Sequence, residues 1–148
     1  MAEQVRNAQV TWNGDLLTGS GTIDYVSSGV FSRMPVSWAA RTGPHNGKTS
    51  PEELLASAHA ACFSMAFSAR LAKNGTPPTK LLTKVEISFD NNSGSWKVAK
   101  SLITVVGDVP GIDLEKFREI AEDAKENCPI SGALKGNVEL AVDATLSS

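Results

Sequence analysis

One segment, residues 51–73, constrains the fold more than any other, because its pattern predicts a long helix with unusually little polar surface. Ser50 stands at the expected N-cap, Pro51 takes the first helical position, and Glu53 completes a capping box. Asn74-Gly75 ends the helix, and the two prolines that follow prevent its return. About 23 residues at about 1.5 Å each give a rod of about 35 Å.

The middle of this helix, residues 54–61, carries no charged side chain on any face. A helix that is apolar all round is buried on all sides, so we expect this one at the centre of the fold. One small sheet cannot cover it. We therefore expect a second copy of the helix, supplied by the partner in a homodimer with a large apolar interface. The alternative is a monomer in which the alanine-rich faces pack on strands.

The segments before and after this helix predict mainly β-structure, because apolar and polar residues alternate in them. Strands are expected at residues 8–12, 18–26, 30–38, 84–89, 96–106 and 138–144. A loop is expected at residues 41–50 and a hairpin turn at residues 91–95. This order predicts an α+β protein with antiparallel sheet, folded as a single domain over residues 1–148.

A second helix is expected after Asp113, which can cap it, and it should end near Asn127. Its expected buried stripe consists of Leu114, Phe117, Ile120, Ala121 and Ala124. Pro129 then opens one short helical turn.

Charge and composition exclude several classes of protein. The net charge is −2 and the basic residues are scattered, so nothing favours nucleic acid or an acidic membrane as a partner. The N-terminus lacks the apolar core of a signal peptide, and no segment is expected to span a bilayer, so we expect a cytoplasmic protein. Two cysteines are too few for a disulfide scaffold, and no pattern indicates a metal or nucleotide cofactor.

Cys62 lies within the apolar helix, where burial should raise the pKa of its thiol and leave it inert unless a cation is brought to it. Glu52 lies ten residues earlier, about 15 Å along the axis, and cannot reach Cys62 of its own helix. Two antiparallel helices could bring Glu52 of one copy near Cys62 of the other. Arg41, in the preceding loop, could then pair with Glu52 and present its guanidinium to the thiolate. The ordinary alternative is a surface arginine and a glutamate favoured in a first helical turn.

Cys128 is expected at the N-cap of the turn that Pro129 opens, where free N–H groups favour a thiolate. Two thiols in such different settings suit a nucleophile and a resolving partner. The alternative is two unrelated core cysteines.

His59 lies three residues before Cys62 on the helix. A Cys–His dyad for acyl transfer is one interpretation, and a structural hydrogen-bonding histidine is the favoured one. His45 is expected to be solvated in its glycine-rich loop. A metal site of His59, Cys62 and Cys128 would be short of ligands.

Two motifs resemble a known family. TSPEELLASAHAACFSMAFS (residues 49–68) closely resembles the signature helix of the OsmC/Ohr family, the osmotically inducible and organic hydroperoxide resistance proteins. VPGID followed by a helix and CPIS (residues 109–131) resembles the second signature, and the early WNGD and GSGT agree. His59 favours the OsmC branch, because the Ohr branch usually has tyrosine there.

The resemblance implies a thiol peroxidase that reduces hydroperoxides. Its implied form is an intertwined homodimer with antiparallel sheets around central helices and active sites at the subunit interface. By position, Cys62 resembles the peroxidatic cysteine, Cys128 the resolving cysteine, Arg41 the activating arginine and Glu52 the glutamate that holds it. Arg33 is the second candidate for the arginine. The implied reductant is an external dithiol, lipoylated or thioredoxin-like, and no cofactor is implied.

Apolar side chains near Cys62 are expected to favour organic peroxides, or else to be plain core. These are Phe63, Met65, Phe67 and residues of the 30–38 strand. Two rival functions stay open: a non-enzymatic redox sensor or small-ligand-binding module, and a Cys–His hydrolase in which His59 contacts Cys62.

Overall fold

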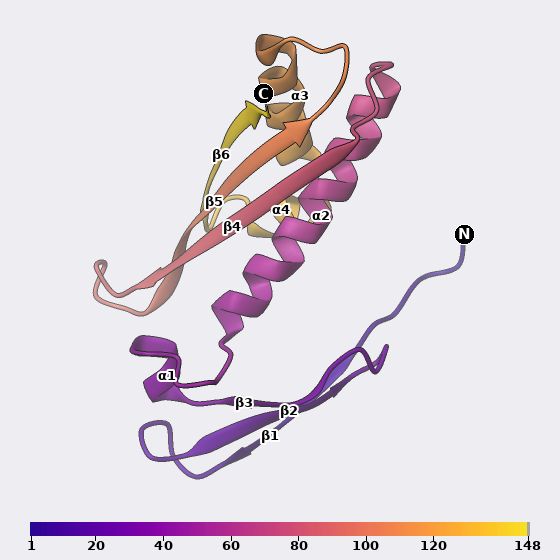
Figure 1. Ribbon diagram of the computed structural model, residues 1–148. Helices are drawn as coiled ribbons and strands as arrows, with labels where there is room; N and C mark the ends of the chain where they lie inside the picture. The colour runs from indigo at the N-terminus through magenta and orange to yellow at the C-terminus, as the bar shows by residue number, and fades with distance from the viewer. Residues whose placement is uncertain (148) are drawn as a thin grey trace. The chain divides into compact units, whose positions relative to one another are not determined.

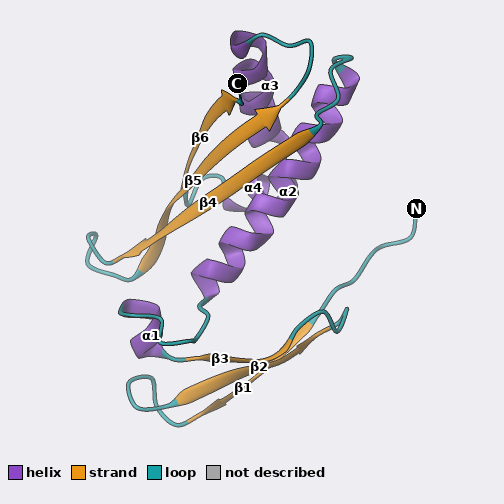
Figure 2. Ribbon diagram, in the orientation of Figure 1, coloured by secondary structure: helices purple, strands orange, loops and turns teal. Residues whose placement is uncertain are grey.

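The computed structural model describes residues 1–147, which form two compact units, residues 1–51 and residues from 52 onward. Each unit combines a three-stranded sheet with helix (Figures 1 and 2). The predicted α+β class is confirmed. The chain length predicted a single domain, and this stays a prediction, because a division into two compact units does not test it.

The N-terminal unit is built on an antiparallel sheet with strand order β1-β2-β3. The strands are β1 (Ala8–Asn13), β2 (Ser20–Val26) and β3 (Ser32–Val36). Gly21 of β2 lies under the Trp12 ring, where an added Cβ would come within 2.6 Å of a ring carbon. Only a residue without a side chain allows this strand to approach the tryptophan so closely.

A short helix, α1 (Trp38–Thr42), follows β3 where the sequence predicted the end of a strand and the start of a loop. The Ser37 hydroxyl caps it by accepting a hydrogen bond from the Ala40 N–H at 3.2 Å. The prediction that Arg41 lies in a loop is therefore wrong. Five residues are too few to show helical periodicity, and only the serine cap marks the helix in the sequence.

The C-terminal unit contains α2 (Pro51–Lys73) from its second residue, Glu52, onward, and this helix has the predicted boundaries. The elements after it are β4 (Lys80–Asp90), β5 (Lys97–Asp108), α3 (Leu114–Asn127), α4 (Pro129–Leu134) and β6 (Glu139–Leu146). The sheet order is β4-β5-β6. β4 and β5 form the predicted hairpin, but β5 and β6 are parallel, which corrects the expectation of purely antiparallel sheet. The crossover through α3 and α4 makes a parallel pair possible.

One apolar core joins the helices α2 and α3 to one face of this sheet (Figure 1). The ring centroids of Phe63 and Phe67 lie 5.4 Å apart, and those of Phe67 and Phe117 lie 5.0 Å apart. Gly107 of β5 faces Phe117 so closely that a Cβ would come within 2.5 Å of the ring. The predicted stripe of α3 is confirmed except at Leu114, which is 39% exposed at the first helical position.

Helix α2 buries only one of its faces within the chain. The buried residues recur along one line of the helix and are Glu52, His59, Phe63, Phe67 and Leu71. Another line of small and apolar residues is exposed and includes Ala58, Ala61, Met65 and Ala69. Burial on all sides, as predicted, is therefore not achieved by one chain.

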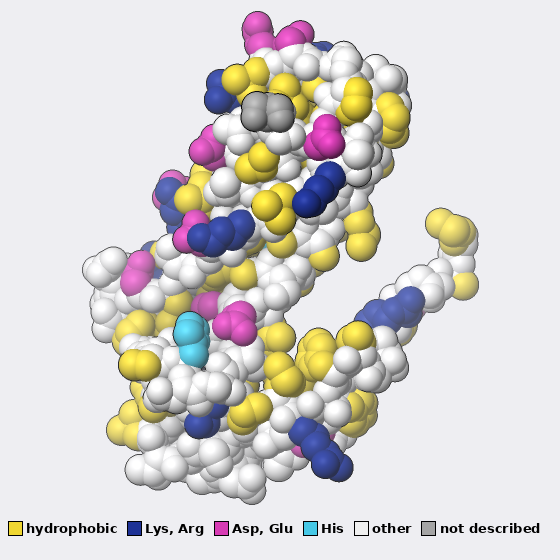
Figure 3. Space-filling view, in the orientation of Figure 1, with side chains coloured by type: hydrophobic (Ala, Val, Ile, Leu, Met, Phe, Trp, Pro, Cys, Tyr) yellow, Lys and Arg dark blue, Asp and Glu magenta, His cyan; other side chains and the backbone are white. Residues whose placement is uncertain are grey.

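By length and composition alone, α2 is also long and apolar enough to cross a membrane, which corrects the expectation that no segment is. The core helix of a soluble protein meets the same criterion. Lys and Arg side chains lie interspersed with Asp and Glu side chains on the face shown in Figure 3.

Candidate functional site

The structure brings together the two cysteines, which are 66 residues apart in the sequence. Cys62 lies on α2, and Cys128 is the residue between α3 and α4. Their Sγ atoms are 2.9 Å apart and both residues are free thiols. An S–S bond is about 2.05 Å long, so a small movement would join them. Cys128 is 1% exposed, whereas Cys62 is only partly buried.

The surroundings of Cys62 disfavour its thiolate. Burial raises the pKa of Cys62, and the contact with Cys128 raises it further, while the Ile130 N–H acts in the opposite direction. The raised pKa agrees with the expectation from the sequence. Within the C-terminal unit, Cys62 is therefore a poor nucleophile at neutral pH.

The surroundings of Cys128 favour its thiolate, as its predicted position before Pro129 indicated. Burial acts to raise the pKa of Cys128, but the Cys62 thiol and the N–H and hydroxyl groups of Ser131 outweigh it, so the pKa is lowered. The Sγ atom makes no regular capping hydrogen bond with α4. We therefore attribute the lowered pKa to several nearby donors acting together rather than to one strong cap.

His59 is fully buried and is hydrogen-bonded through both ring nitrogens. Nδ1 lies 2.7 Å from the Ser101 hydroxyl, and Nε2 lies 2.8 Å from the Ser131 hydroxyl. Burial lowers the pKa of His59, so the ring is neutral near pH 7. The structural role predicted for His59 is confirmed. The Cys–His dyad is wrong, because both ring nitrogens are engaged by serines and neither serves Cys62 as a base.

Ser101 and Ser131 were not identified from the sequence as site residues. Both had a signal. In HAAC and in CPIS, a cysteine and a polar residue are three positions apart, which places His59 beside Cys62 and Ser131 beside Cys128 on their helices. The alternation of β5 places Ser101 on the face that carries the core residues of that strand.

Arg41 lies in the last turn of α1, with its guanidinium 5.8 Å from the centroid of the Trp38 ring. It lines an apolar pocket of about 190 Å³ in the N-terminal unit. The other lining residues are Trp12, Leu16, Val36, Ser37, Trp38 and Pro51. An arginine beside an apolar pocket can bind a molecule with a polar head and an alkyl tail.

Glu52 and Arg33 are the other two predicted site residues. Glu52 lies in the first turn of α2 and is 8% exposed. Arg33 is exposed on β3 with a φ of 55°, a backbone conformation that non-glycine residues rarely adopt. The two arginines belong to the N-terminal unit and the two cysteines to the C-terminal unit. A site that combines them stays a prediction.

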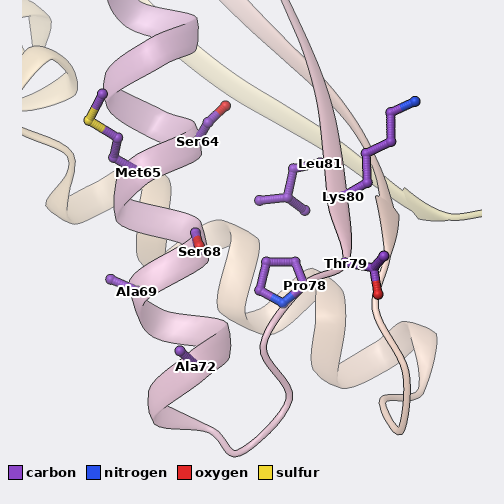
Figure 4. Close-up of a pocket in the computed structure, with 9 residues that line it drawn as sticks. All are labelled: Ser64, Met65, Ser68, Ala69, Ala72, Pro78, Thr79, Lys80 and Leu81. Atoms are coloured by element: carbon purple, nitrogen blue, oxygen red, sulfur yellow. The ribbon is translucent and has the colours of Figure 1, made fainter.

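The apolar residues expected around Cys62 divide into core and surface. Phe63 and Phe67 are fully buried, so they are core rather than pocket walls. Met65 is 73% exposed and lies at an open groove of about 610 Å³ between α2 and the start of β4 (Figure 4). Neither cysteine lines this groove. Among residues 1–147, no group of three or more His, Cys, Asp or Glu side chains could hold a metal ion.

Comparison with known proteins identifies the family. The sequence pattern of the OsmC-like protein family matches residues 43–143. The chain is 38% identical to peroxiredoxin OsmC of Escherichia coli over 135 residues, which cover 91% of this chain and 93% of that protein. It is 33% identical over 97 residues to organic hydroperoxide resistance protein OhrB of Bacillus subtilis, covering 64% of this chain and 68% of that protein.

Solved structures show the same fold. The crystal structure of OhrB of Bacillus subtilis matches with a TM-score of 0.70 and 26% identity, over 93% of this chain and 97% of that one. An OsmC-like protein from Mycoplasma pneumoniae matches with a TM-score of 0.74 and 20% identity, over 99% of this chain and all of that one. The family pattern, the sequence identity and the shared fold agree. The chain belongs to the OsmC-like protein family.

Proposed function

We propose that this protein is a cysteine-based peroxidase that reduces organic hydroperoxides, and also hydrogen peroxide. The observation that carries the proposal is the 2.9 Å distance between the Sγ atoms of Cys62 and Cys128. The similarity to proteins named peroxiredoxin and organic hydroperoxide resistance protein supports the same activity.

In the proposed reaction, the Cys62 thiolate attacks the terminal oxygen of the hydroperoxide. The O–O bond breaks, the alkoxide leaves and takes up a proton to become the alcohol, and Cys62 becomes a sulfenic acid. The Cys128 thiolate then attacks the Cys62 sulfur, and the hydroxide that leaves takes a proton to become water. An external dithiol reduces the resulting disulfide by thiol–disulfide exchange. A lipoyl group or a thioredoxin-like protein is the proposed donor.

Cys62 needs a cation in this reaction, because its surroundings in its own unit raise the pKa of its thiol. We assign that task to Arg41, held by Glu52, both from the partner subunit. A guanidinium lowers a thiol pKa and can hydrogen-bond the peroxide oxygens as charge develops. The apolar pocket beside Arg41 supports an organic substrate, since it would receive the alkyl group.

A homodimer is part of the proposal. The exposed line Ala58, Ala61, Met65 and Ala69 on α2 needs an apolar partner, and a second α2 offers the same small side chains. Replacing Ala61 by Glu would put two charges into that interface. Sedimentation should then show a monomer, whereas a monomeric native protein would contradict the dimer. We place this dimer in the cytoplasm, where reducing conditions regenerate the thiols.

The decisive experiment is a peroxide assay with lipoyl and thioredoxin-like dithiol donors, using an organic hydroperoxide and hydrogen peroxide. The native protein should turn over, and Cys62→Ser should be inactive with every donor. Full activity of Cys62→Ser would overturn the proposal. A native protein that oxidises once and is not regenerated would instead be a redox sensor.

A further inference from the structure

A chain of hydrogen bonds connects β5 to α4 through His59 of α2. The Ser101 hydroxyl contacts Nδ1, and the Ser131 hydroxyl contacts Nε2, at 2.7 and 2.8 Å. Ser131 lies three residues after Cys128, and His59 lies three residues before Cys62. Helix α2 therefore contacts the start of α4 at two places, each one helical turn from the other. One is the contact between the two sulfurs, and the other is the His59–Ser131 hydrogen bond.

The number of protons in this chain limits what Ser131 can do. A neutral imidazole has one N–H donor and one acceptor nitrogen, and a serine hydroxyl has one proton to donate. If Nε2 carries the ring proton, Ser131 accepts it and its own O–H stays available. If Nε2 is the acceptor, Ser131 donates its only hydroxyl proton to the ring. The burial that lowers the pKa of His59 keeps the ring neutral, so one of these two states holds.

The surroundings of the two serines differ in a way that favours the first state. Ser131 and Cys128 are neighbours on the first turn of α4, and the Ser131 hydroxyl is among the groups that stabilise the Cys128 thiolate. Ser101 lies on β5 and is fully buried there. A proton on Nε2 therefore lets Ser101 donate to Nδ1 and leaves the Ser131 proton for the Cys128 thiolate.

We propose that His59 is the positioning residue of the resolving cysteine: its Nε2–H holds the Ser131 oxygen, so that the Ser131 hydroxyl donates to Sγ of Cys128. His59 does not touch the reacting sulfurs and acts through Ser131. This hydrogen-bonded arrangement keeps Cys128 as a nucleophilic thiolate. It also fixes α4 one helical turn from the two sulfurs that form the disulfide.

This inference rests on the proposed function for its use, because only a peroxidase or sensor needs a resolving thiolate. In the step concerned, the electron pair of the Cys128 sulfur forms the S–S bond, the S–O bond of the Cys62 sulfenic acid breaks, and hydroxide leaves as water with one proton. No co-reactant beyond the peroxide is needed. Losing the Ser131 donor should slow this step and leave the attack of Cys62 on peroxide unchanged.

The test compares two serine variants that each remove one buried hydroxyl hydrogen-bonded to His59. Both are made in a Cys62→Ser background, so that Cys128 is the only thiol, and the absorbance of its thiolate is followed from pH 6 to pH 10. Ser131→Ala should lower the thiolate fraction about tenfold at pH values below the pKa, since it removes a hydrogen bond to a charged group. Ser101→Ala should leave the fraction within about twofold, and Ser131→Thr should restore it. Equal thiolate fractions in both alanine variants would overturn the proposal.

A second measurement needs no variant and decides the matter if Ser131→Ala does not fold. Nitrogen NMR of the reduced native protein, labelled at histidine, reports which ring nitrogen of His59 carries the proton. The proposal requires Nε2–H, and a proton on Nδ1 would contradict it. The two proposals can fail separately. If peroxide leaves both thiols unoxidised, the proposed function fails, while the thiolate titrations and the NMR spectrum still decide the inference.

Discussion

Cys62 lies in the middle of α2, where neighbouring turns use the backbone N–H groups, whereas Cys128 precedes the first turn of α4, where N–H groups have no helical partner. The two sulfurs are 2.9 Å apart. Burial nevertheless dominates at Cys62 and raises its pKa, while nearby donors outweigh burial at Cys128 and lower its pKa. The Cys62 thiol acts most strongly among the groups that lower the pKa of Cys128, and the N–H and hydroxyl groups of Ser131 add to it.

Because their pKa values shift in opposite directions, the two cysteines need different groups to form a thiolate. The C-terminal unit supplies the groups that lower the pKa of Cys128, namely the Cys62 thiol and the N–H and hydroxyl groups at the start of α4. Among its described residues, 52–147, no cation lowers the pKa of Cys62. A peroxidatic cysteine in that position must be activated by a group from elsewhere. Under the proposed function, the resolving cysteine is prepared by its own unit, whereas the nucleophile depends on the proposed dimer.

Replacing Cys128 by Ser should have the largest effect of the variants that test this comparison. The protein should reduce one equivalent of peroxide and then stop, because no thiol is left to resolve the sulfenic acid. Mass spectrometry should show one added oxygen atom on the chain, or more after excess peroxide. Since Cys128 helps to raise the pKa of Cys62, a thiolate titration should also show a lower pKa for Cys62. Sustained turnover without Cys128 would remove it from the mechanism.

Arg41→Ala should have the next largest effect. In a Cys128→Ser background, where Cys62 is the only thiol, loss of the cation should reduce the thiolate at fixed pH about tenfold or more. The absorbance of the thiolate, followed against pH, measures this directly. Arg41→Lys keeps the charge and loses the planar fork, so it should fall between the native protein and the alanine variant. An unchanged titration in Arg41→Ala would transfer the role to Arg33 or to another cation.

The elements with strong end signals could be predicted from the sequence. Ser50, Pro51 and the Asn74-Gly75 pair defined α2 to the residue, and Pro129 placed Cys128 at the start of α4. Alternation also gave β4 and β6, since a half-buried strand has to alternate.

Features that depend on distant partners could not be predicted. The parallel pairing of β5 and β6 depends on how α3 and α4 cross between them, and no local pattern encodes it. The partners of His59 lie 42 and 72 residues away, so the sequence favoured a hydrogen-bonded histidine without naming the serines. The sequence could not distinguish the exposed line on α2 from a buried one. Apolar residues give the same pattern whether they are covered by their own chain or by another chain.

The smallest expected effect concerns stability, and it tests whether His59 is held neutral by the fold. Burial lowers the pKa of His59 below its unfolded value of about 6.5, so the unfolded chain binds a proton at a pH where the folded chain does not. Stability should therefore fall as the pH decreases below about 6.5, by at most about 1.4 kcal/mol per pH unit.

Urea unfolding between pH 6.5 and 5.5 measures the slope of stability against pH before carboxylates contribute. His59→Gln should flatten it, although the variant itself is less stable, because two buried serines lose their ring partner. His45→Gln is the matched control, because it removes the other histidine of the chain, which is exposed. A slope that survives in His59→Gln would show that the histidine is not the group responsible.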